Sequence, residues 1–157
     1  MQEEKKFFIT TAEVEKLKKE EQDLQALKFA KIKGETPKIL QSEDLNPEYL
    51  SFQEDLSLLE ARLADLDYIL KNYELITVPP KEKQKVINLG ATVLVEVGGQ
   101  TDEFEILGSL EANPATGRIS SESPVGKALL GHKVGDKIIV SSPVKTIYKV
   151  KAIRYFS

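Results

Sequence analysis

The stretch SEDLNPEYLSF contains the residues whose types could do chemistry. Glu43, Asp44 and Glu48 surround an Asn-Pro pair just before a long apolar repeat. Carboxylates are hard oxygen ligands suited to Mg²⁺, so they could help to hold a divalent ion. The same charges could instead stabilise a helix start through the helix dipole. Because a few loose carboxylates make a poor Mg²⁺ site, we expect no metal or other cofactor in the free protein.

The rest of the chain offers few catalytic groups. It has no cysteine and one histidine, His132, which excludes disulfides, thiolate metal sites, Cys-His pairs and multi-histidine sites. A Ser-His-Asp triad would have to use His132, but this residue lies in LLGHKVGDK, a turn setting without a nucleophile elbow. We therefore interpret His132 as an exposed structural residue.

Composition indicates an ordinary soluble protein. The 157 residues are 30% charged and 41% apolar, with a net charge of −3 that gives no global attraction to nucleic acid or to an anionic membrane. No apolar window reaches a membrane-spanning length and the start MQEEKKFFITT lacks a signal core, so we expect a cytoplasmic protein without membrane contact. Two short lysine runs are interpreted as solvated surface: Lys16, Lys18, Lys19 and Lys81, Lys83, Lys85.

The first half is predicted to be helical. Thr10 is a candidate N-cap with Glu13 as its capping-box partner, and a helix is expected from there to Gly34. Its apolar stripe is imperfect, since Glu21 and Lys28 fall on it. The stripe comprises Val14, Leu17, Leu24 and Leu27.

A second helix is predicted from Pro47, with Asn46 as its cap, to about Asn72. Its apolar residues alternate in steps of three and four, as in a coiled-coil seam. They are Tyr49, Phe52, Leu56, Leu59, Leu63, Leu66, Leu70 and Tyr73. We expect this helix to fold back antiparallel on the first in a monomer, although an intermolecular coiled coil would use the same pattern. Thr36 and Pro37 predict a break and restart between them.

The period changes to two in the second half. ATVLVEV and DEFEILG, joined at GG, predict a hairpin, and DKIIVSS and TIYKVKAIRYF predict two more strands. Ser123, Pro124 and Gly131 are the cap, first position and stop of one short helix. The predicted class is α+β, with a helical hairpin over 1–78 and its tip at about 35–46, a proline-marked linker over 79–87 and a small sheet domain over 88–157.

These segments resemble the bacterial Gre transcript-cleavage factors, the GreA/GreB family. The resemblance rests on LGATVLVEV, EFEILG and SPVGKALLGHKVGDKIIV in the second half, and on EVEKLKKE and EYLSFQEDLSLLEARLADLD in the first. It implies an antiparallel coiled-coil hairpin followed by a sheet domain like that of FK506-binding proteins. It also implies that the sheet domain docks on RNA polymerase while the coiled coil enters the secondary channel.

The family's activity, as the resemblance implies it, is to make a backtracked polymerase cut its own transcript. Such a factor is a cofactor and not a complete enzyme; it shares Mg²⁺ with the polymerase active site and meets nascent RNA and DNA only in the elongation complex. Five residues of the SPVGKALLGHKVGD segment are the implied partner-binding set: Ser123, Pro124, Gly131, Gly135 and Asp136.

The predicted tip departs from the family pattern D-L-x-E-N-x-E-Y, because DLNPEY is two residues shorter. Anchored on Asp44 and Leu45, the alignment keeps the working Asp, and the Glu is either deleted or displaced to Glu48. Anchored on Tyr49, it places the working positions on Ser42 and Leu45, and Glu48 becomes the later, non-working Glu. Glu43 and Asp44 could form a substitute pair.

Three function classes follow. The first is a cleavage and anti-arrest factor that uses Glu43, Asp44 and Glu48. The second is a Gre-like regulator that occupies the channel without promoting cleavage, which the altered tip favours. A prolyl isomerase is suggested only by the sheet type, and ATVLVEVGGQTDEFEILG contains no signature of an aromatic-lined pocket.

Overall fold

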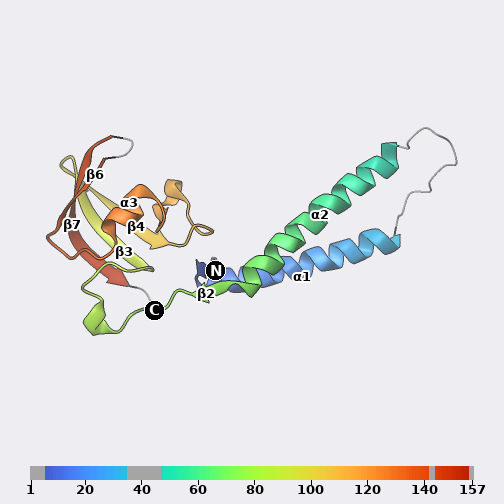
Figure 1. Cartoon of the computed structure of the whole chain (residues 1–157), viewed down its shortest axis with the longest axis horizontal. Coiled ribbons are helices and arrows are strands. Elements are labelled where there is room, and N and C mark those ends of the chain that lie inside the picture. The colour runs from blue at the N-terminus through green and yellow to red at the C-terminus, as the bar shows by residue number, and fades with distance from the viewer. Residues whose placement is uncertain (1–5, 35–46, 142–143, 156–157) are drawn as a thin grey trace, which may run out of the picture. The chain divides into compact units, whose positions relative to one another are not determined.

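The structure is a computed structural model that describes residues 6–34, 47–141 and 144–155. By packing it divides into two compact units. One is Ala12–Asn72, and the other combines Met1–Thr11 with Tyr73–Ser157. The first unit is helical and the second is built on a β-sheet, which confirms the predicted α+β class (Figure 1).

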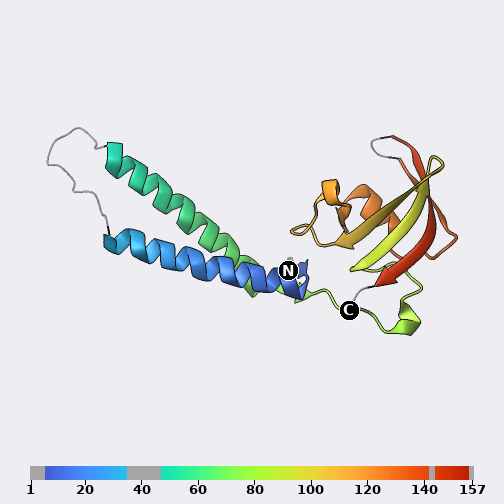
Figure 2. The same ribbon diagram turned by 180° about the vertical axis from the view of Figure 1, so that it is seen from behind.

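The helical unit consists of α1 (Thr11–Gly34) and α2 (Pro47–Lys71). α1 begins directly after the predicted cap Thr10 and ends at the predicted stop Gly34, while α2 begins at the predicted Pro47. The two helices run side by side within one chain (Figures 1 and 2). Their direction is antiparallel, because Glu20 early in α1 pairs with Arg62 late in α2. The predicted restart at Thr36 and Pro37 lies outside the described residues.

Apolar packing between the helices is concentrated at one end of the hairpin. Leu66 is fully buried, and Val14, Leu17 and Ile69 are nearly so. The helices move apart toward the ends marked by Gly34 and Pro47 (Figures 1 and 2). As a result, the other predicted stripe residues of α2 from Tyr49 to Leu70 are only half-buried.

Three details of the predicted seam were wrong. Leu27 is 55% exposed, because the face of α1 toward α2 is continued there by the half-buried Lys28 and Lys31. Ile69, which the predicted stripe omitted, is buried more deeply than Leu70. The last predicted member, Tyr73, lies beyond the end of α2 in a short strand.

Over the described residues, the main sheet of this unit has five strands in the order β5-β4-β3-β7-β6. The predicted hairpin forms from β3 (Ala91–Val97) and β4 (Gln100–Leu107), which pair antiparallel. β7 (Thr146–Tyr155) pairs antiparallel with β3 on its other side, and β6 (Lys137–Val140) pairs with β7 at the sheet edge. The sequence did not predict β5 (Arg118–Ser120), which is parallel to β4.

One face of this sheet is covered by α3 (Pro124–Leu129), the predicted short helix. Leu129 of α3 is fully buried against side chains that alternate along the strands, as period two requires. The core comprises Ile87, Ala91, Val93, Val95, Ile106, Ile119, Leu129, Ile138, Val140 and Val150. Ile87 therefore joins the core although it lies in the segment predicted as a linker.

Two short strands, β1 (Phe7–Ile9) and β2 (Tyr73–Leu75), form a separate parallel pair in the same unit. The β1 backbone lies against Gly108: a Cβ on that glycine would be 2.0 Å from the Phe8 carbonyl oxygen. Only glycine permits so close an approach. Two 3-10 turns, η1 (Lys81–Lys83) and η2 (Pro114–Thr116), complete the unit.

Candidate functional site

The first turn of α2 holds the one predicted tip carboxylate that the structure describes. Glu48 follows Pro47 there and is exposed. A carboxylate in a first turn interacts favourably with the helix dipole, so Glu48 has a structural role available without any metal. Glu43 and Asp44 lie outside the described residues. Within the described ranges, no three acidic or histidine side chains gather closely enough to hold a metal ion.

Ion pairs across the hairpin fix the register of α1 against α2. Arg62 donates to both carboxylate oxygens of Glu20, at 2.7 Å from Nε and 3.0 Å from Nη2. The hydrogen bond from Arg62 holds the pKa of Glu20 below its ordinary value, against an opposing effect of partial desolvation. Lys31 binds Asp55 at 3.3 Å and lies 5.2 Å from the centre of the Phe52 ring. These contacts continue the pairing of the helices where apolar burial ends.

The predicted partner-binding residues at the start of α3 have clear structural roles. The Ser123 hydroxyl accepts from the Gly126 N–H at 3.1 Å and donates to the Ser120 carbonyl oxygen at 2.6 Å. Pro124 occupies the first turn, where its missing N–H costs nothing. A Cβ on Gly126 would be 2.0 Å from the Ser120 oxygen, so glycine is required there as well. Ser123 and Pro124 thus form a fixed corner between β5 and α3.

The other predicted partner-binding residues shape the turn between α3 and β6. Gly131 and Gly135 have φ values of +84° and +94°, a region that favours glycine. Asp136 accepts from the Lys133 N–H at 3.0 Å, and its Oδ2 lies 3.1 Å from Nδ1 of His132. The Lys133 N–H, and then the His132 ring, hold the pKa of the Asp136 carboxyl below its ordinary value. His132 therefore orders a turn, as its interpretation as a structural residue requires.

The structure brings the five predicted partner-binding residues into one continuous segment, but mainly as its framework. The side chains that this framework presents to solvent are others: Lys127 and Lys133 are exposed, and Val134 is 57% exposed. The sequence did not single out these three residues, because candidates were chosen by motif. The available signal was an apolar residue, Val134, in a turn bounded by glycines.

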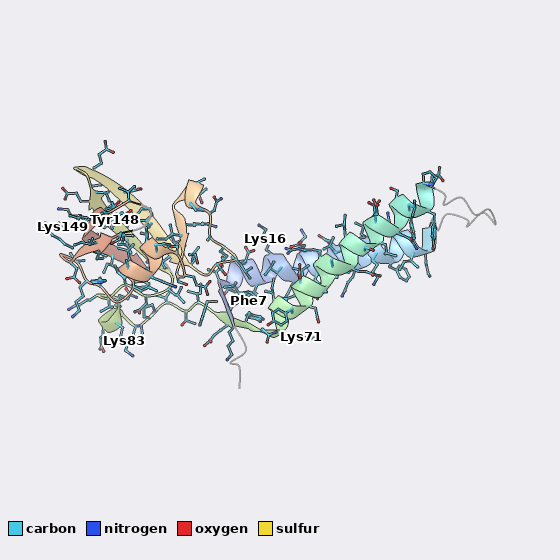
Figure 3. All side chains as sticks on the ribbon, turned by 45° about the horizontal axis from the view of Figure 1, so that its top comes forward. Phe7, Lys16, Lys71, Lys83, Tyr148 and Lys149 are labelled. Carbon is cyan, nitrogen blue, oxygen red and sulfur yellow. The ribbon has the colours of Figure 1, made fainter. Side chains whose placement is uncertain are left out.

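Over the residues that the structure covers, no helix is both long enough and apolar enough to cross a bilayer. This agrees with α1 and α2 carrying charged side chains along their length, among them Lys16 and Lys71 (Figure 3).

Comparison with known proteins identifies the family. The family model described as "Transcription elongation factor, GreA/GreB, C-term" matches residues 81–155. The GreA transcription elongation factor of Clostridium acetobutylicum is 42% identical over 163 aligned positions, covering 98% of this chain and all of that one. GreA of Halalkalibacterium halodurans is 38% identical, covering 91% of this chain and 92% of its own.

Among solved structures, the GreA factor homolog 1 (Gfh1) of Thermus thermophilus aligns with 25% identity and a TM-score of 0.42, over 96% of this chain and 99% of that chain. The identity to the GreA factors extends through both the helical and the sheet unit. This chain therefore belongs to the GreA/GreB family of transcription elongation factors.

Proposed function

We propose that this protein binds RNA polymerase and stimulates the polymerase's own cleavage of backtracked nascent RNA. The observation that carries the proposal is the 42% identity to a GreA elongation factor over the full length of that protein. A chain that retains both units of such a factor has the parts needed to dock and to reach an active centre. The protein itself is then a cofactor of the polymerase and not an enzyme.

The helical hairpin supports a role in reaching through a narrow channel. α2 has 25 residues, which at 1.5 Å per residue gives a rod of about 37 Å. Paired helices present only a small cross-section, and the pairs Glu20–Arg62 and Lys31–Asp55 stiffen their association. In the proposed function this rod enters the secondary channel of the polymerase.

In the proposed function, the predicted tip carboxylates supply the metal-binding chemistry. Glu43, Asp44 and Glu48 are all hard oxygen donors of the kind that Mg²⁺ prefers, so their chemistry fits a metal shared with the polymerase active site. When bound there, Mg²⁺ would supply Lewis acidity and an activated water. Glu48 is exposed in the first turn of α2.

Docking is assigned to the sheet unit. Hydrogen bonds of Ser123 and Asp136 order the corner and the turn around α3, and Gly131 and Gly135 adopt the positive φ values that the turn requires. A preformed surface binds with less loss of conformational entropy. We propose that the factor acts as a cytoplasmic monomer and meets RNA and DNA only inside the elongation complex.

One specific feature favours a second candidate function. The stretch DLNPEY is shorter than the family's tip pattern and preserves the working acidic pair in neither alignment. A factor that docks and enters the channel without delivering that pair would regulate the polymerase by occupancy alone.

A cleavage assay separates the two functions. The protein is added to a stalled, backtracked elongation complex of its own polymerase, and short 3′ RNA fragments are measured against a sample without factor. Fragments that appear faster with the factor support cleavage stimulation. Binding to the complex without faster cleavage supports the occupancy function, and no binding contradicts both.

A further inference from the structure

The edge hairpin of the sheet exposes two large apolar side chains directly opposite each other. Ile139 on β6 and Ile147 on β7 are register partners and are 57% and 53% exposed. Their neighbours on β6, Ile138 and Val140, are buried in the core on the side of α3. Because side chains alternate along a strand, Ile139 and Ile147 lie on the face of the sheet opposite α3.

The same face of this hairpin is positively charged. Lys137 and Lys149 are also register partners, two positions along each strand from the isoleucines, and therefore share their face. Figure 3 labels Lys149 on β7. Like charges directly opposite each other destabilise a sheet. Within the described part of the chain, neither lysine forms an ion pair. Glu96 of β3, the register partner of Lys149 on its other side, pairs with Lys151 at 2.8 Å and attracts Lys149 more weakly, so one carboxylate faces several lysines here.

The rest of this sheet face is different, because its charges are neutralised within the protein. Glu103 of β4 pairs with Arg154 of β7 at 3.1 Å, and Glu105 of β4 pairs with Arg118 of β5 at 3.7 Å. Excess positive charge and exposed apolar surface are thus concentrated together on the β6–β7 hairpin. The turn of the hairpin adds a further exposed positive charge, Lys145, and a further exposed apolar side chain, Val144, which is 71% exposed.

We propose that the outer face of the β6–β7 hairpin, formed by Lys137, Ile139, Ile147 and Lys149, binds an acidic amphipathic helix of a partner protein. Carboxylates of that helix would neutralise the opposed lysines while its apolar side chains cover the isoleucine pair. The positive charge of the lysines favours acidic groups on the partner. The isoleucine pair between the lysines favours a protein partner, because apolar side chains can cover it. Single-stranded nucleic acid is typically bound on aromatic stacking platforms, and its phosphates would leave the isoleucines exposed.

This surface is separate from the proposed polymerase-docking segment. Ser123, Pro124 and the turn that ends at Asp136 belong to α3 and its connections, whereas Ile139 and Ile147 point away from α3. The inference therefore does not depend on the proposed function.

Titration of the full-length, isotopically labelled protein with a synthetic helical peptide tests the proposal. The peptide carries leucines on one face, flanked by glutamates, and a control peptide carries lysine at each glutamate position. Amide NMR shifts are expected for residues 137–140 and 144–149 with the acidic peptide only. Binding should weaken at least tenfold in the charge-reversal variant Lys137→Glu/Lys149→Glu and in Ile139→Thr/Ile147→Thr.

A matched variant controls for net charge. Lys18→Glu/Lys19→Glu makes the same charge change at exposed positions of α1 and should bind the acidic peptide like the wild type. Circular dichroism verifies that each variant is folded. The proposal is overturned if the acidic peptide does not bind or if folded hairpin variants bind it unchanged. Equal or tighter binding of single-stranded RNA would also overturn the proposal. Self-association through the same residues in sedimentation would do so as well, because either result would show that the surface binds a different partner.

Discussion

Glu111 accepts two hydrogen bonds from Thr10, a residue 101 positions earlier in the chain. The Thr10 N–H donates to Oε2 at 2.9 Å and the Thr10 hydroxyl donates to Oε1 at 2.6 Å. Thr10 directly follows β1, so this contact joins β1 to the loop after β4 within the sheet unit. The close approach of Phe8 to Gly108 lies beside this contact in the sequence and holds β1 in the same unit.

Replacing Glu111 by alanine should destabilise the protein. Both hydrogen bonds are charge-assisted and partly buried, and their loss should lower the free energy of unfolding by about 1–3 kcal/mol. Thr10→Val keeps the N–H bond and should cost less than Glu111→Ala. Urea unfolding measures both, with Glu74→Ala at an exposed position of β2 as the control. Equal stability of Glu111→Ala and the control would contradict a stabilising role for the Thr10–Glu111 hydrogen bonds.

Gly126→Ala should be poorly tolerated. The new Cβ would meet the Ser120 carbonyl oxygen at 2.0 Å, and displacing that backbone should cost about 1–3 kcal/mol or more. Gly34→Ala is the matched control, because a Cβ there meets nothing within 4 Å. Thermal unfolding should separate the two variants clearly. If Gly126→Ala melts like the wild type, the corner between β5 and α3 is not as tight as described.

Burial along α2 predicts unequal effects of identical substitutions. Leu66 is fully buried whereas Leu58 is 72% exposed. Leu66→Ala should therefore lower the free energy of unfolding by about 2–5 kcal/mol. Leu58→Ala should change it by no more than about 0.5 kcal/mol. Chemical unfolding followed by helical circular dichroism tests this, and similar losses in both variants would show that the helices pack through another face.

The Glu20–Arg62 pair predicts a pH dependence. The pKa of Glu20 is lowered in the folded protein, chiefly by its hydrogen bond from Arg62. The pair therefore adds stability above the unfolded-state pKa of glutamate, about 4.3, and loses it as the pH falls through the folded value. Because both side chains are partly exposed, the contribution is at most about 1 kcal/mol.

Unfolding free energies between pH 7 and pH 3 test this dependence. Glu20→Gln should remove part of the loss of stability on acidification, since the variant has no proton to gain at this position. Asp67→Asn, which breaks the more exposed pair with Lys71, should leave most of the loss in place. Identical pH profiles for Glu20→Gln and the wild type would mean that the pair contributes nothing in solution.

Local signals predicted the main elements of this fold. Pro47 after Asn46 located the start of α2, and the double glycine at Gly98 and Gly99, both with positive φ, located the β3–β4 turn. Such signals act over a few residues, so the sequence alone is enough to find them.

Long-range contacts could not be predicted in this way. β1 and β2 have three residues each, and the whole helical hairpin separates them in the sequence. Thr10 and Glu111 are 101 positions apart, and no local sequence pattern around either residue indicates that they are in contact. Leu27 satisfied the helical period, yet it is exposed, because Lys28 and Lys31 continue the face of α1 toward α2 there, and which residues form that face depends on packing between the helices. Gly131 and Asp136, which the sequence motif singled out, shape the turn between α3 and β6, and their assignment to partner binding stays a prediction.

Substitution of the tip carboxylates tests the proposed cleavage role directly. Glu43→Gln with Asp44→Asn keeps size and hydrogen-bonding groups but removes two negative charges. If these residues complete a metal site in the polymerase, stimulated cleavage should fall a hundredfold or more, about 3 kcal/mol in the barrier, while folding and polymerase binding persist. If they only stabilise the start of α2, stability should fall by at most about 2 kcal/mol and cleavage should be intact.

Glu48→Gln decides between the two alignments of the tip. Glu48 lies in the first turn of α2, where loss of its charge should weaken the helix start by about 0.3–1 kcal/mol. Loss of cleavage in Glu48→Gln alone, with binding retained, would assign it the displaced catalytic position. Intact cleavage there, combined with loss in the Glu43/Asp44 variant, would assign the role to the substitute pair. If all three proteins bind the polymerase and none, the wild type included, stimulates cleavage, then occupancy of the channel is the function.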